Sequence, residues 1–156
     1  MPHNIHVAAI GGGEYLPRLI RAILDRQIIP AGNLILSMNS GEACAAAEGS
    51  GAALCEDNAT AVVKSEVVLL CADRRALPTV LAPISQCTGG RTLVVVCTGG
   101  VDVAYIKERV VSGTEIIAAT LHQGEDGRLS ASYEIDRGVR LFLHQPCRDM
   151  VDAMCD

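Results

Sequence analysis

The sequence predicts an α/β protein built on a doubly wound, mainly parallel sheet. Hydrophobic residues make up 49% of the chain, whereas aromatic residues make up only 3% and Trp is absent. Such a composition is typical of cores in which Ala, Val, Leu and Ile fill buried parallel strands. Apolar runs of about five residues also alternate with segments of helical period, as in βαβ units. The length of 156 residues favours a single domain.

Six apolar runs are predicted as the strands of this sheet, because each is flanked by turn or cap residues. They are residues 5–10, 34–37, 52–55, 67–71, 93–97 and 115–120. Segments of helical period separate most of these runs, so the connections are expected to be right-handed crossovers.

Helices are expected in the segments between the strands. The first has an apolar face of Leu16, Leu19, Ile20, Ile23 and Leu24, and the others cover residues 41–49, 58–65, 75–86 and 103–110. Pro17 suits the first turn of a helix, where its missing N–H would have no partner. Asp57 and Asp102 stand directly before two of the helices and are predicted as their N-caps.

After Thr120 the pattern changes to that of a hairpin and a short tail. EDGR and DRG are turn signals, and LSASYEI and VRLFLHQ alternate apolar and polar residues at period two. We expect hairpin strands at 131–135 and 139–143, followed by a short amphipathic stretch at 149–154. The single domain, residues 1–156, would then consist of a βαβ core over 1–120 and a hairpin and tail over 121–156.

Charge and cysteine content exclude several classes of protein. With a formal net charge of −5 and scattered Lys and Arg, no nucleic-acid or membrane partner is expected. No apolar stretch reaches the ~18 residues of a membrane span, and residues 1–10 do not resemble a signal peptide, so a cytoplasmic protein is predicted. The seven cysteines form no CxxC and are expected to be reduced. Of these, Cys147 and Cys155, near the C-terminus, are the candidates for exposed, oxidisable thiols.

A glycine triplet separates the first strand from the first helix, where Rossmann-like proteins bind the pyrophosphate of a dinucleotide. In that motif Gly11 would permit the tight turn, and Gly13 the approach of a phosphate. The third position of the motif, usually a small residue, is Leu16. Glu14 adds a carboxylate beside the phosphate position. Two interpretations stay open: the turn binds a phosphate, or Glu14 itself supplies the negative charge that a helix N-terminus favours.

Three segments of the sequence resemble the cofactor domain of pyrroline-5-carboxylate reductases. They are HVAAIGGGEYLPRLIRAILDRQIIPAGNLILSMNS, EDNATAVVKSEVVLLCADRRALPTVLAPI and RTLVVVCTGGVDVAYIKERV, which follow the order and spacing of that family over residues 5–119. The glycine turn, the DNATAVVKSEVV helix and strand, and the TGGV turn at 98–101 are the most specific parts. The resemblance implies binding of NADP or NAD and hydride transfer to a small cyclic imine, a step of proline biosynthesis.

The resemblance also implies cofactor-binding residues at the carboxyl ends of the first, second, fourth and fifth strands. They are Gly11, Gly12, Gly13, Glu14, Tyr15, Met38, Asn39, Ser40, Ala72, Asp73, Arg74, Thr98, Gly99 and Gly100. The turn after the second strand has no Asp or Glu for a ribose 2′-hydroxyl and no Arg for a 2′-phosphate. Ser37, Asn39 and Ser40 could donate to a 2′-phosphate or form a plain polar turn.

Two segments near the implied substrate depart from the family. After the fourth strand, Val-Lys-Pro is replaced by Ala72-Asp73-Arg74, whose Arg74 could reach an anionic ligand. After the sixth strand, Met-Pro-Asn-Thr-Pro is replaced by the sequence TLHQG at 120–124. His122 in this segment is the one candidate general acid. No metal site is expected, because His3 and His144 have no carboxylate or Cys partner at metal spacing and His6 lies within an alternating strand.

Three classes of function remain open from the sequence. The first is an NAD(P)-dependent oxidoreductase of the reductase type, favoured by Gly11, Gly13 and the TGGV turn. The second is a non-catalytic Rossmann module that binds a nucleotide or a protein partner, favoured by Glu14, Leu16 and the absence of a counterpart to the family's helical second domain. The third is another small nucleotide-binding enzyme. Cofactor binding is expected to be weak or lost. A homodimer is expected to cover the hairpin edge.

Overall fold

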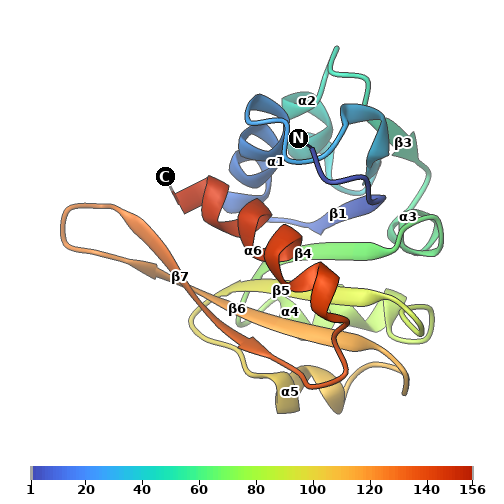
Figure 1. The fold of residues 1–156 in the computed structure, drawn as a ribbon, viewed down its shortest axis with the longest axis vertical. Helices are drawn as coiled ribbons and strands as arrows, with labels where there is room; N and C mark the ends of the chain where they lie inside the picture. Colours follow the sequence, from blue (N-terminus) through green and yellow to red (C-terminus); the bar gives the residue numbers. More distant parts are fainter. Residues whose placement is uncertain (1, 156) are drawn as a thin grey trace.

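Seven strands form one sheet in the computed structural model, which describes residues 2–155. Their order across the sheet is β3-β2-β1-β4-β5-β6-β7 (Figure 1). The strands are β1 Val7–Gly11, β2 Leu34–Ser37, β3 Ala53–Cys55, β4 Val67–Asp73, β5 Thr92–Thr98, β6 Glu115–Gln123 and β7 Leu129–Ile135. The first six run parallel, and β7 pairs antiparallel with β6. The predicted doubly wound sheet is confirmed, with its switch point between β1 and β4, where such sheets bind ligands.

Six α-helices connect or cover these strands. They are α1 Tyr15–Asp25, α2 Gly41–Ala46, α3 Asn58–Val63, α4 Leu77–Leu81, α5 Val103–Lys107 and α6 Leu141–Cys155, with 3-10 turns at Ala31–Asn33 and Ala82–Ile84. Asp57 and Asp102 cap α3 and α5 as predicted, since each carboxylate accepts a backbone N–H three residues on. The helix expected over 75–86 is divided into α4 and a 3-10 turn. Pro83 lies in that turn and has no N–H to continue the α-helical hydrogen bonds.

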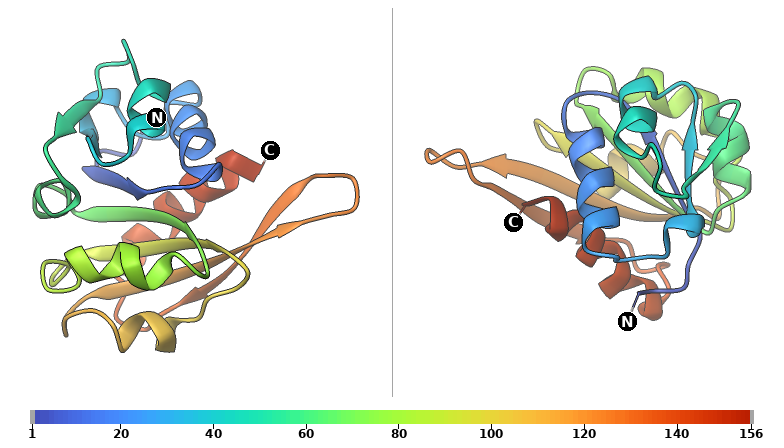
Figure 2. Two further views of the ribbon diagram at one scale, coloured as in Figure 1. Left: turned by 180° about the vertical axis from the view of Figure 1, so that it is seen from behind. Right: turned by 90° about the horizontal axis from the view of Figure 1, so that it is seen from above.

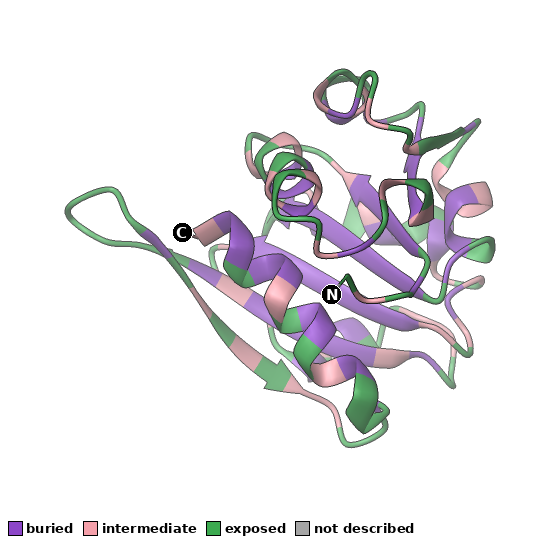
Figure 3. Ribbon diagram, turned by 45° about the horizontal axis from the view of Figure 1, so that its top comes forward, coloured by how far each residue is buried: buried purple, intermediate pink, exposed green. Residues whose placement is uncertain are grey.

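The two faces of the sheet carry separate apolar layers because side chains alternate along each strand. In β4, Val67, Leu69 and Cys71 pack with α1, α2 and α6. The intervening residues of the same strand pack with α3, α4 and α5 on the opposite face. Figure 3 shows the central strands buried between these layers. The buried strands therefore hold the carboxyl ends of β1, β4 and β5 in fixed positions.

The predicted strand at 139–143 is wrong, because these residues lead into and begin α6. The antiparallel partner of β7 is instead β6. The side chains of α6 that face the core recur at helical spacing, as Leu143, Cys147, Met150, Val151 and Met154. Burial of this face outweighs Pro146, which lies inside the helix and removes one backbone donor.

Helix α6 packs beside α1 and β7 (Figures 1 and 2). Arg18 Nε of α1 donates to the carbonyl of Met154 at 3.1 Å, and His3 Nε2 lies 3.0 Å from Asp149 Oδ2. One expectation is thereby corrected, because Cys147 is fully buried. The tail expected at the C-terminus is thus part of the core.

The β6–β7 hairpin forms an arm that projects beyond the rest of the sheet (Figures 1 and 2). Its tip, residues 122–128, is exposed, and Gly124 N donates to Arg128 O across the turn at 2.8 Å. No helix within residues 2–155 is long and apolar enough to cross a membrane. Over the same residues, no cluster of three His, Cys, Asp or Glu side chains is placed to hold a metal ion.

Candidate functional site

The glycine turn between β1 and α1 begins at a position that only glycine can occupy. Gly11 has φ +109°, and a Cβ there would lie 2.0 Å from the carbonyl oxygen of Cys71 in β4. Gly12 N donates to that same oxygen at 3.0 Å. Gly11 therefore allows the two central strands to approach each other at the switch point.

The next two glycines face open space. Gly13 has φ +83°, and a Cβ at Gly12 or Gly13 would meet no atom within 4 Å. Because the following residues begin α1, this turn presents backbone to the space above the helix N-terminus, the arrangement that accepts phosphates in other proteins. The residue at the third position of the motif, Leu16, is fully buried in the core under α1.

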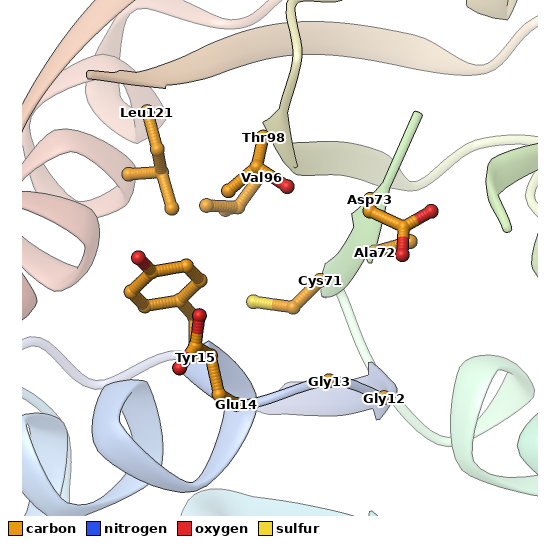
Figure 4. Close-up of a pocket in the computed structure, with 10 residues that line it drawn as sticks. All are labelled: Gly12, Gly13, Glu14, Tyr15, Cys71, Ala72, Asp73, Val96, Thr98 and Leu121. Carbon is orange, nitrogen blue, oxygen red and sulfur yellow. The ribbon is translucent and has the colours of Figure 1, made fainter. Parts of the chain in front are cut away.

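Three hollows adjoin the glycine turn. The first, of about 170 Å³, is lined by Gly12, Gly13, Glu14, Tyr15, Cys71, Ala72, Asp73, Val96, Thr98 and Leu121 (Figure 4). The second, of about 440 Å³ on the β2 side, is lined by Gly11, Gly12, Gly13, Glu14, Leu16, Pro17, Asn39, Ser40, Gly41, Glu42 and Ala43. The third, of about 260 Å³ on the side of β6 and β7, is lined by Glu14, Tyr15, Thr98, Leu121, Gln123 and Leu129.

Glu14 lines all three hollows. It is exposed at the start of α1, and its side chain makes no capping hydrogen bond. Figure 4 shows its side chain extending from the turn that also holds Gly12 and Gly13. None of the residues lining the three hollows is Lys or Arg, whereas Asp73 adds a carboxylate to the first hollow and Glu42 adds one to the second. The site is therefore negatively charged.

The inner wall of the first hollow is apolar and chemically inert. Val96 and Leu121 are buried, and Cys71 is 2% exposed. Burial raises the pKa of the Cys71 thiol to about 12, with the neighbouring Cys97 as a smaller cause. Cys71 is consequently a protonated wall residue rather than a nucleophile.

Comparison with known proteins gives matches to solved structures alone. No model of a protein family matches the sequence, and no curated protein matches it. A pyrroline-5-carboxylate reductase from Coxiella burnetii superposes with a TM-score of 0.79 at 13% identity, over 97% of this chain and 57% of that one. The chain shares its fold with these reductases. This confirms the fold that the sequence resemblance implied.

Two further matches contain a bound dinucleotide. A pyrroline carboxylate reductase from Plasmodium falciparum with NADP bound has a TM-score of 0.75 at 17% identity, over 99% of this chain and 56% of that one. An imine reductase variant from Myxococcus stipitatus in complex with NAD⁺ has a TM-score of 0.66 at 16% identity, over 97% and 53%. The present chain spans little more than half the length of each of these matches.

Within this reductase fold, the polar side chains after β2 are already hydrogen-bonded to the protein. The hydroxyl of Ser37 bonds to Asn58 Oδ1, and Ser40 Oγ donates to the carbonyl of Gly11 at 2.9 Å. Asn39 Oδ1 accepts from Asn58 N at 3.1 Å. The turn thus ties β2 to the glycine turn and to α3, while Met38, which is 65% exposed, and Asn39 remain open to the surface.

Glu42 lines the second hollow but is not among the residues that the sequence predicted for the site. It lies in the first turn of α2 and lines the second hollow together with Asn39 and Ser40. The turn directly after β2, through Ser40, contains no acidic residue, and Glu42 follows in α2. A signal was available, since an acidic residue in the first turn of a helix that follows the second strand faces the same edge of the sheet.

The turn after β4 positions its two charged residues differently. Asp73 lines the first hollow, and its carboxylate accepts the N–H of Ala76 at 2.8 Å. The guanidinium of Arg74 lies 3.6 Å from the centre of the Tyr105 ring, and that of Arg109 lies 3.5 Å from the same centre. Two guanidinium groups approach one ring this closely from opposite faces, so Arg74 is engaged with α5 rather than with the hollow.

The turn after β5 brings Thr98 to the first and third hollows. Gly99 and Gly100 follow with φ of +91° and +89° and line neither of them. Their positive φ values turn the chain from β5 toward the Asp102 cap of α5. The carbonyl of Thr98 accepts the N–H of Arg74 at 3.1 Å, which joins the turns after β4 and β5.

His122 is not brought into the site. Its neighbours Leu121 and Gln123 line the third hollow, and alternation along β6 directs the side chain of His122 to the other face of the sheet. There its Nε2 lies 2.8 Å from Ser132 Oγ of β7. The first and third hollows therefore contain hydroxyl groups and carboxylates but no imidazole.

Proposed function

We propose that this protein binds a nicotinamide dinucleotide across the glycine turn and reduces a small imine with it. The observation that supports this most directly is the pair of hollows that meet at Gly12 and Gly13, at the carboxyl ends of the central strands. The same fold is found in reductases with bound NADP or NAD⁺. When bound, a reduced nicotinamide supplies a hydride, and the protein supplies binding and orientation.

The two hollows suit the two ends of a dinucleotide. The backbone of Gly11, Gly12 and Gly13 would face the pyrophosphate, and Met38, Asn39 and Ser40 would border the adenosine. On the other side, the nicotinamide would contact Tyr15, Ala72, Asp73 and Thr98, with Arg74, Gly99 and Gly100 holding the two turns in place. Because the first hollow has a buried apolar wall, it would shield the reacting ring from water.

We propose that the affinity for the dinucleotide is limited by Glu14. Its carboxylate lines both hollows where the pyrophosphate would lie. Two unit charges ~4 Å apart repel by about 4 kcal/mol at an effective dielectric of ~20. Since Glu14 is exposed, screening lowers this cost. A remaining 1.4 kcal/mol would still weaken binding roughly tenfold.

The cofactor we propose is NADH rather than NADPH, because of Glu42. A carboxylate accepts a hydrogen bond from a ribose 2′-hydroxyl but repels a 2′-phosphate. The second hollow contains Glu14 and Glu42 and no Lys or Arg. The Ser37 and Ser40 hydroxyls already donate within the protein.

A homodimer is proposed from two features near the last strand. β7 is an edge of the sheet, and its outer backbone groups pair with no other strand among the described residues. Leu141 and Phe142, at the start of α6, are 81% and 62% exposed. A second copy that covers both would give a mass by light scattering of twice 16.4 kDa.

A calorimetric titration of NADH and NADPH into the natural protein and the Glu14→Asn variant tests this function. We expect weak binding of NADH to the natural protein and about tenfold tighter binding to the variant, since one opposing charge is removed. Glu48→Gln, which removes an exposed carboxylate at the end of α2, serves as the control. Absence of NADH binding to both the natural protein and Glu14→Asn would favour the non-catalytic alternative, a module that binds another nucleotide or a protein.

A further inference from the structure

The third hollow is continuous with the first, because the two share Glu14, Tyr15, Thr98 and Leu121. It extends from this junction to Gln123 and Leu129, the β6–β7 pair next to the turn of the arm. Figure 4 shows the side chains of Tyr15, Thr98 and Leu121, which belong to both linings, around the first hollow. If the first hollow holds a nicotinamide, a molecule in the third hollow lies directly beside it.

The electrostatics of the third hollow are simple. Glu14 is the one charged residue among those that line it, and its lining contains no Lys, Arg or His. Within residues 2–155 the Glu14 carboxylate forms no ion pair and no side-chain hydrogen bond that would neutralise it. Tyr15, Thr98 and Gln123 add neutral polar groups, and two leucines add apolar surface. A bound anion would find no countercharge here and would face a carboxylate.

The position of Tyr15 gives a second, independent indication of the charge of the ligand. Tyr15 and Glu14 both line the first and the third hollow. An aromatic ring attracts a cation to its face. A carboxylate and an aromatic ring that border the same small space are the two groups expected around an organic ammonium or iminium ion.

We propose that the third hollow binds a small iminium or ammonium ion that carries no carboxylate, with Glu14 as its counterion and Tyr15 against its face. The proposal rests on the proposed function in so far as it concerns reduction. In that step the iminium carbon accepts the hydride, and the electron pair of the C=N π bond becomes the lone pair of the amine product. The neutral amine then takes a proton from water. The step therefore needs no proton donor from the protein.

This assignment separates the protein from pyrroline-5-carboxylate, which is named in the match from Coxiella burnetii, but not from imines in general. Pyrroline-5-carboxylate carries a carboxylate, which would lie beside Glu14 with no Arg or Lys in the lining. A cyclic imine of the same ring size without the carboxylate would keep the attraction between its iminium and Glu14. It would avoid the repulsion between a substrate carboxylate and Glu14. Glu14 would then hinder binding of the pyrophosphate and support binding of the substrate.

The test uses pyrrolidine, which is a cation at neutral pH, and proline as probes, without any dinucleotide. Binding of each to the natural full-length chain is measured by ligand-observed NMR titration. We expect pyrrolidinium to bind at least tenfold more tightly than proline. Glu14→Gln should lower the affinity for pyrrolidinium about tenfold and Tyr15→Leu several-fold, while Glu48→Gln should leave it unchanged.

Equal affinity for proline and pyrrolidinium, no measurable binding of pyrrolidinium, or an unchanged affinity in Glu14→Gln would overturn the proposal. Thermal unfolding of each variant verifies that it folds, and Glu14 is exposed enough that Gln is accommodated. Because no dinucleotide is present, the outcome is independent of the NADH titration. Loss of NADH binding with retained pyrrolidinium binding would refute the proposed reduction and leave the cation site in place.

Discussion

The first and second hollows lie on opposite sides of one glycine turn and differ in how the protein forms them. The first is walled by buried residues of three central strands, Cys71, Val96 and Leu121. The second is bordered by the short helix α2 and the exposed residues Asn39 and Glu42. Packing of buried side chains forms the first hollow, whereas exposed polar and charged side chains border the second. Shape is therefore expected to govern binding in the first hollow, and electrostatics in the second.

The largest effect is expected at Gly11, the first residue of the glycine turn between the two hollows. Gly11→Ala would place a Cβ 2.0 Å from the Cys71 carbonyl oxygen, at a φ of +109°. The β1 and β4 backbones would have to separate, and we expect a loss of at least about 3 kcal/mol in the free energy of unfolding. Denaturant unfolding measures this loss. Gly12→Ala, whose Cβ would meet open space, is the matched control with an expected change below about 1 kcal/mol.

Most of the fold could be predicted from the sequence, but the C-terminal helix could not. The glycines, the apolar runs and the aspartate caps act through local rules, so the parallel sheet and most helix starts follow from them. The C-terminal helix does not, because the alternation of VRLFLHQ favours a strand and Pro146 disfavours a helix. The helix is stabilised by tertiary packing, because Leu143, Cys147 and Met150 are buried against the core.

The site was predictable in its backbone and less so in its side chains. The sequence places Gly12, Gly13 and Thr98 at strand ends, and these residues do line the hollows. It cannot show that the Ser40 hydroxyl is already bonded to Gly11, or that Arg74 stacks on Tyr105, because both depend on tertiary contacts.

An intermediate effect is expected in the second hollow. Glu42→Gln should raise the affinity for NADPH about threefold to tenfold and change that for NADH little, because the removed charge faces only the 2′ substituent. Parallel calorimetric titrations of the two dinucleotides measure the ratio. The Glu48→Gln control should leave the ratio unchanged. Equal gains for NADH and NADPH would mean that Glu42 acts on the whole dinucleotide and does not select between them.

The smallest effect is expected at the wall of the first hollow. Since burial raises the pKa of Cys71 to about 12, only about one thiol in ten thousand is ionised at pH 8. We expect no alkylation of Cys71 by iodoacetamide at pH 8, while the half-buried Cys44 reacts. Peptide mass spectrometry distinguishes the two sites. Reaction should increase only as the pH rises toward the pKa, and rapid labelling at pH 8 would show that the wall opens to solvent.

The most direct test of the central claim, that a dinucleotide lies across the glycine turn, is an amide NMR titration of the isotopically labelled protein with NADH. The account predicts progressive shifts of Gly12 and Gly13, together with Asn39 on the second hollow and Thr98 on the first. Amides at the far end of the sheet, such as that of Gly89, should not move. Absence of shifts at Gly12 and Gly13 at saturating NADH, or shifts confined to residues outside the two hollows, would contradict it.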